Sequence, residues 1–144
     1  MHIVTADDQD ETVPPEKGQD GIENVRVAED GHTAGWLVNL WASCCVSYSI
    51  PVRMVLWRDG RVIRRIDSNQ AIFGWTFLRG GKEVAFHTAP LHGSEVYDCS
   101  RVDVQTGREL EEWSMMQKTP APDWVYLLDK QFAMPDPDDL PPQP

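Results

Sequence analysis

The sequence predicts an all-β protein with two four-stranded antiparallel sheets and a short C-terminal helix. Three observations carry this prediction. Short apolar segments alternate with tight-turn signals, these segments fall into two sets of four, and a helical pattern of apolar residues follows them. The 144 residues, 41% of them hydrophobic, are enough for one domain with a substantial core.

Eight segments between residues 24 and 113 have the length and composition of β-strands. Four turn signals that contain Asp-Gly, Gly-Gly or Thr-Gly separate pairs of these segments. Glycine at such turns supplies the positive φ that tight antiparallel connections need. The predicted strands are 24–28, 35–41, 51–57, 61–66, 71–78, 83–88, 96–104 and 109–113.

The two sets of strands share one pattern. Aligning them superimposes the turn glycines Gly31 and Gly81, which are 50 residues apart, and the turn glycines Gly60 and Gly107, which are 47 residues apart. A period of this length with four strands in each unit is typical of β-propeller blades.

The segment "DVQTGRELEEW" at 103–113 resembles the Asp-x-x-Thr-Gly-x-x-Leu…Trp ending of blades in WD40-like, quinoprotein-like and related bacterial β-propellers. The wider pattern, over about residues 22–114, resembles small uncharacterised bacterial proteins with propeller-like repeats. The resemblance implies two propeller-blade-like sheets and brings no catalytic residues with it. Two units cannot close a propeller of four to eight blades. We therefore expect the sheets to pack on each other, to join a ring of copies as a homo-oligomer, or to be covered by the remaining segments.

Both ends of the chain are rich in Asp, Glu, Pro and Gly and contain little that could be buried, which predicts flexible tails. Between them, residues 120–132 have Asp123 as an expected N-cap, with Trp124, Leu127 and Leu128 on one face of a short helix. We expect this helix to dock on an open sheet. The predicted organisation is an acidic N-terminal tail 1–20, a β domain 21–119 with units of about 22–68 and 69–115, a docking helix 120–132 and a C-terminal tail 133–144.

The net charge of −10 comes mainly from the two ends, because residues 21–130 hold 12 bases and 14 acids. This balance indicates no nucleic-acid partner and no membrane-surface partner. No apolar run reaches the roughly 18 residues of a membrane span, and the N-terminus lacks the regions of a signal peptide. We expect a cytoplasmic location by default, and the mature form of an exported protein is the alternative.

In the blade pattern, the connections 42–49 and 89–98 emerge at the same end of the two sheets and should lie side by side. We call this predicted surface the rim. It gathers the aromatic and reactive side chains of both connections. The candidate binding residues are Trp41, Tyr48, His92, Glu95 and Tyr97. The tryptophans at strand positions of the pattern, Trp36, Trp57, Trp75 and Trp113, are expected in the core instead.

The three cysteines, Cys44, Cys45 and Cys99, lie in or next to the rim. Adjacent cysteines lack the spacing of a zinc site, and a Cys44–Cys45 bridge would be strained because consecutive Cα atoms are only about 3.8 Å apart. Buried packing, or a disulfide from one of the pair to Cys99, is favoured over metal or redox chemistry. No metal site and no other cofactor is predicted.

The basic hairpin residues Arg58, Arg61, Arg64 and Arg65 could bind an anion, but positive charges on an exposed edge strand also prevent edge-to-edge pairing, and we favour that interpretation. No nucleophile elbow or paired-carboxylate arrangement indicates a hydrolase. The leading hypothesis is a non-enzymatic protein-interaction or ligand-binding module that uses the rim. The alternative is a small thiol- or metal-dependent enzyme centred on Cys44, Cys45 and His92.

Overall fold

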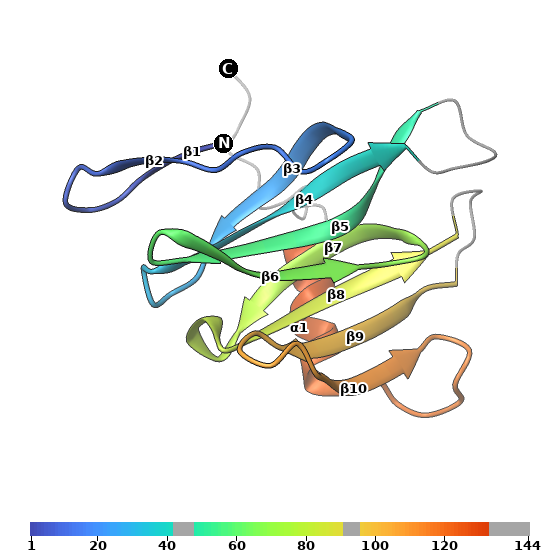
Figure 1. The fold of residues 1–144 in the computed structure, drawn as a ribbon. Helices are drawn as coiled ribbons and strands as arrows, with labels where there is room; N and C mark the ends of the chain where they lie inside the picture. Colours follow the sequence, from blue (N-terminus) through green and yellow to red (C-terminus); the bar gives the residue numbers. More distant parts are fainter. Residues whose placement is uncertain (42–47, 91–95, 133–144) are drawn as a thin grey trace, which may run out of the picture.

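The computed structural model describes residues 1–41, 48–90 and 96–132. In this part of the chain two four-stranded antiparallel sheets, a small hairpin and one helix form the fold (Figure 1). The elements are β1 (His2–Val4), β2 (Asp10–Thr12), β3 (Gln19–Val27), β4 (Thr33–Trp41), β5 (Ser49–Arg58), β6 (Arg61–Asp67), β7 (Ala71–Leu78), a 3-10 turn (Arg79–Gly81), β8 (Glu83–Ala89), β9 (Asp98–Asp103), β10 (Glu109–Ser114) and α1 (Asp123–Phe132).

Each four-stranded sheet is a meander built from one contiguous stretch of chain. The first sheet has the order β3-β4-β5-β6, and the second has the order β7-β8-β9-β10. The predicted all-β class with two such sheets and a C-terminal helix is confirmed. The described residues form no closed propeller. The turn glycines have the positive φ expected of them, 71° at Gly31, 91° at Gly60, 97° at Gly81 and 75° at Gly107.

The two sheets pack face to face, and the main core lies between them. Side chains alternate along β4, so that Leu37 points into this core while its neighbours Trp36 and Val38 point to the outer face. All three are buried, which means that the first sheet is covered on both sides. The core residues are Leu37, Met54, Leu56, Ile72, Trp75, Val84, Phe86, Val102 and Val104.

The N-terminal segment covers the outer face of the first sheet. Val13 is buried there with Trp36 and Trp57, and Met1 and Ile3 pack against the same cluster. Residues 1–20 therefore differ from the expected tail without regular structure, since they contain β1, β2 and the beginning of β3. The physical reason is that the apolar side chains of this segment leave water by packing on Trp36 and Trp57, which belong to β4 and β5.

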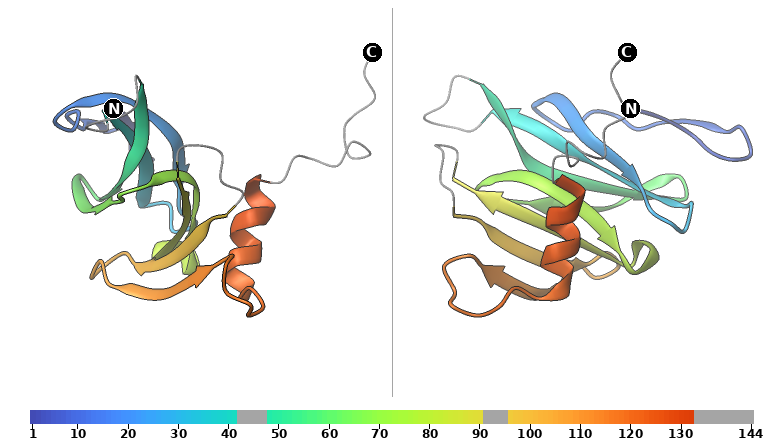
Figure 2. Two further views of the ribbon diagram at one scale, coloured as in Figure 1. Left: turned by 90° about the vertical axis from the view of Figure 1, so that its right-hand side faces the viewer. Right: turned by 180° about the vertical axis from the view of Figure 1, so that it is seen from behind.

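Helix α1 covers the outer face of the second sheet (Figure 2). It lies within the predicted span 120–132, and Trp124, Val125 and Leu128 pack on Ala85 and Cys99. The predicted apolar face is wrong at one position, because Leu127 is 53% exposed and Val125 is buried in its place. The sequence 124–128 is apolar or aromatic throughout, so the sheet decides which side of the helix is buried. No helix in the described residues is long and apolar enough to cross a membrane.

Candidate functional site

The candidate site begins at the end of the β4–β5 hairpin where the connection between the two strands leaves the sheet. Trp41 is the last residue of β4 and is paired with Ser49, the first residue of β5, and Tyr48 directly precedes Ser49. Trp41 is 58% exposed and Tyr48 is 51% exposed. Two large aromatic residues thus face solvent at the same strand end.

This exposure sets Trp41 apart from the other five tryptophans, and all six lie in the described ranges. Trp75 is buried in the core between the two sheets, as predicted. Trp36 and Trp57 are buried on the outer face of the first sheet instead, and Trp124, on α1, is buried against the second sheet. Trp113 is partly buried against the helix-side cluster. Indole rings carry a large apolar area, and four of the six are buried while Trp113 is partly buried. The one exposed indole, Trp41, is therefore a candidate contact residue.

Polar contacts hold the backbone beneath the two exposed rings. The Ser49 hydroxyl donates to Asp20 Oδ2 at 2.6 Å, and Asn39 Nδ2 donates to Glu23 Oε2 at 3.3 Å. These contacts tie β5 and β4 to β3, so three strands brace the hairpin end. Sequence reasoning missed this brace because Asp20 falls in the segment expected to be a tail.

Tyr97 lies just before β9 and is engaged inside the sheet–helix contact. Its hydroxyl donates to Asp129 Oδ2 at 3.2 Å, and its ring meets His87 at 5.6 Å and Trp113 at 6.3 Å between centroids. Burial, together with the nearby Asp129 carboxylate, raises the pKa of Tyr97 to about 12. Burial lowers the pKa of His87, against the opposing effect of Asp129. These groups are therefore neutral at pH 7.

Cys99 is a fully buried free thiol under α1. Burial raises its pKa to about 12, helped by the Asp129 and Asp98 carboxylates. It is therefore a small packing residue here, which is one of the roles foreseen for it. The other predicted rim residues, Cys44, Cys45, His92 and Glu95, lie outside the described residues. In the described part, no three His, Cys, Asp or Glu side chains are placed to hold one metal ion.

The strand ends that flank the two predicted rim connections lie on one side of the molecule. The ends of β4 and β8 point the same way, and β5 and β9 begin on that side (Figures 1 and 2). Phe73, in β7 near this side, is a third exposed aromatic residue, with 51% of its side chain accessible, and its ring meets His87 edge-on at 6.5 Å. The sequence feature that could have indicated the exposure of Phe73 is the neighbouring Gly74. A glycine within an apolar strand often marks irregular strand pairing, and the pairing of β7 with β8 shifts between Ile72 and Gly74.

The fold and this exposed end define a two-sheet β-protein with covered outer faces and an aromatic strand end. Comparisons with protein-family models, with curated proteins and with solved structures give no match to the chain.

Proposed function

We propose that the chain is a non-enzymatic protein-interaction module that binds its partner through the strand end carrying Trp41 and Tyr48. The observation that carries the proposal is the 58% exposure of Trp41, when the other tryptophans are buried or partly buried. Trp and Tyr are the residues that most often dominate binding energy at protein interfaces. Exposed on a braced hairpin end, they would lose little conformational entropy on binding.

We also infer that each sheet corresponds to one blade of a β-propeller-like protein. The support is that both sheets are four-stranded meanders in the same order and are packed face to face. Blades of this kind present the connections at their strand ends to partners, which fits the position of Trp41.

The test is capture of partners from extracts of the source cells by the immobilised protein. Trp41→Ala and Tyr48→Ala should each weaken capture by about tenfold or more, since truncation of a central aromatic contact typically costs over 1.4 kcal/mol. Tyr126→Ala is the matched control, because Tyr126 is 61% exposed but lies on α1. Equal capture by all variants would contradict this surface.

Fluorescence gives a second readout of the same surface. Because Trp41 is the one exposed indole of the six, acrylamide should quench the wild-type protein more than Trp41→Phe. Addition of a captured partner should protect the wild-type emission from quenching. Unchanged quenching at saturating partner would place the contact elsewhere.

A further inference from the structure

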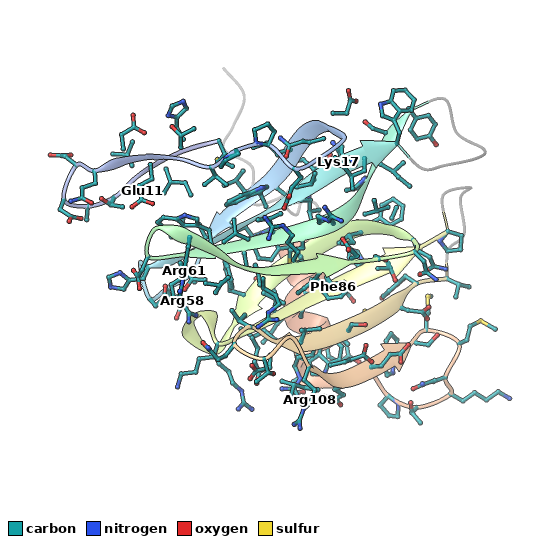
Figure 3. The ribbon with its side chains drawn as sticks, viewed as in Figure 1. Glu11, Lys17, Arg58, Arg61, Phe86 and Arg108 are labelled. Carbon is teal, nitrogen blue, oxygen red and sulfur yellow. The ribbon has the colours of Figure 1, made fainter. Side chains whose placement is uncertain are left out.

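A groove lies at the opposite end of the molecule from Trp41, between the β5–β6 hairpin and the β9–β10 turn. It encloses about 340 Å³, and three arginines, one carboxylate and the backbone of the β9–β10 turn line it. The lining residues used below are Arg58, Arg61, Arg64, Asp59, Val104 and Gln105. Figure 3 shows Arg58 and Arg61 beside each other at the tip of the hairpin. This volume is within the range of pockets that hold small ligands.

Neutral acceptors hold two of these guanidinium groups in place. Arg64 donates through Nε to the Val104 carbonyl at 3.4 Å, and its other arm donates to the Gln105 carbonyl. Arg58 donates to the Thr33 hydroxyl at 2.8 Å and to the Gly81 carbonyl at 3.3 Å. Carbonyl and hydroxyl oxygens orient a guanidinium but leave its positive charge in place.

Ion pairing separates these arginines from others in the chain. Arg53, Arg65 and Arg101 each have a carboxylate oxygen within 4.0 Å. Among the described residues, Arg58, Arg61 and Arg64 have none within that distance. The four arginines of the predicted basic hairpin are therefore not equivalent, since Arg65 pairs with Glu16 and the other three line the groove.

Two carboxylates close to the groove, Asp59 and Asp30, each contact another group. Asp59 lies in the lining, with Oδ1 3.5 Å from His32 Nδ1 and its side chain mostly in solvent. Asp30 accepts from the backbone amides of His32 and Thr33 and from the Thr33 hydroxyl. Burial raises the pKa of Asp30, but these hydrogen bonds, with a smaller contribution from the Arg58 charge, lower it overall. The lining thus contains three positive charges and one negative charge, and the Glu11 carboxylate lies outside it, beside Gly60 at the hairpin tip.

Gly107 makes room for the Arg64 side chain. A Cβ at this position would lie 3.0 Å from an Arg64 terminal nitrogen, and the φ of 75° also favours glycine. The Thr-Gly turn of the second sheet therefore serves as the wall against which the guanidinium lies. Asp103 fixes this turn by accepting from the Thr106 amide and hydroxyl at 2.8 and 3.0 Å.

We propose that this groove binds the phosphate group of a small phosphorylated ligand. Arginine matches the geometry of phosphate oxygens with paired donors, and preoriented donors lose less entropy on binding. A small ligand fits better than a nucleic acid because the groove is local and the folded region has no excess of positive charge along a surface. Arg61, exposed at the mouth, would close on the ligand while Arg58 and Arg64 form the floor.

The experiment is an NMR titration of the full chain with inorganic phosphate and with pyrophosphate, following the arginine Nε–H signals. We expect chemical-shift changes at the groove that saturate with one ligand bound per chain. The dissociation constant should be roughly tenfold larger for Arg61→Gln and for Arg64→Gln, because the loss of one charged hydrogen bond typically reduces affinity by about this factor. Arg65→Gln is the matched control on the same strand and should bind within about twofold of wild type.

Three results would overturn the proposal. One is the absence of saturable shifts at Arg58, Arg61 and Arg64. Another is equal weakening by Arg65→Gln, which would indicate attraction by overall charge. The third is saturable binding of citrate without phosphate binding, which would assign the groove to carboxylate ligands. Arg61→Gln keeps the test valid if Arg64→Gln unfolds, because the side chain of the exposed Arg61 makes no hydrogen bond or ion pair with the described residues. Thermal unfolding monitored by circular dichroism shows whether each variant is folded.

Discussion

The indole ring of Trp75 lies directly against the backbone of Gly35, across the interface between the two sheets. A Cβ at Gly35 would approach Trp75 Cη2 to 2.6 Å and Leu56 Cδ2 to 2.8 Å. The same indole donates from Nε1 to the Asn24 carbonyl at 2.9 Å, so one side chain of β7 contacts both β4 and β3. The close packing of the two sheets depends on the missing side chain at Gly35.

Replacement of Gly35 by alanine should therefore destabilise the protein. The added methyl group meets two buried side chains with no open space, and overpacking of this kind costs about 1–3 kcal/mol. Urea unfolding measures the change in free energy. Gly21→Ala in β3 is the control, since its nearest neighbour would be Asn39 Nδ2 at 3.8 Å. Equal stability of the two variants would show that the Gly35–Trp75 contact relaxes freely.

Cys99 should resist alkylation in the folded protein. The thiol is buried under α1 and its pKa is raised to about 12, so very little thiolate exists at pH 8. In a Cys44→Ser, Cys45→Ser background, iodoacetamide should modify Cys99 at least about a hundredfold more slowly than a free cysteine of pKa about 8.5. Trp124→Ala, which removes part of the helix cover, should accelerate the reaction. Rapid modification of the otherwise unchanged protein would contradict the packing role.

Stability should fall as the solution is acidified through the ordinary pKa of histidine. Burial lowers the pKa of His87 in the folded state, with Asp129 acting in the opposite direction. Below about pH 6.5 the unfolded chain binds the proton more readily than the folded chain, so the free energy of unfolding decreases until the folded pKa is passed. Above about pH 6.5 this loss is absent.

The measurement is thermal unfolding between pH 7.5 and 5 for wild type and His87→Gln. On acidification the stability of His87→Gln should decrease less than that of wild type. His32→Gln is the control, because the His32 side chain is 72% exposed. A slope that changes equally in both variants would assign the pH dependence to groups other than His87.

The N-terminal segment should contribute measurably to stability. Val13→Asp places a charge in the buried cluster with Trp36 and Trp57 and should cost about 2 kcal/mol or more in urea unfolding. Val4→Asp is the matched control in the neighbouring hairpin strand, since Val4 is 67% exposed. If both variants have wild-type stability, the segment does not cover the first sheet in solution.

The strands and the helix could be predicted because their signals are local. Apolar alternation, turn glycines such as Gly60 and Gly107, and the acidic start of the helix at Asp123 all act within a few residues of the element they define. Trp41 and Tyr48 were proposed as contact residues because they lie next to or in the connection 42–49, and both are exposed.

The remaining features depend on partners far away in the sequence. Val13 becomes buried only because Trp36 and Trp57 provide an apolar surface, and Val125 replaces Leu127 on the inner helix face because the second sheet selects it. Arg64 and Arg65 are neighbours in the sequence but have different partners. Arg64 donates to the Gln105 carbonyl, 41 residues away, and Arg65 pairs with Glu16, 49 residues away. No pattern in one short segment contains this information.

All strand pairing within each four-stranded sheet comes from one continuous stretch of chain, and residues 68–70 join β6 to β7. The two halves therefore meet as two subunits of a heterodimer would, with a three-residue tether that keeps each at millimolar effective concentration for the other. A chain cut in this tether would consist of two fragments, each with a complete sheet and an apolar face that only the other fragment covers. The dissociation constant of the two fragments would measure directly the affinity of one sheet for the other, which cannot be measured while residues 68–70 join them.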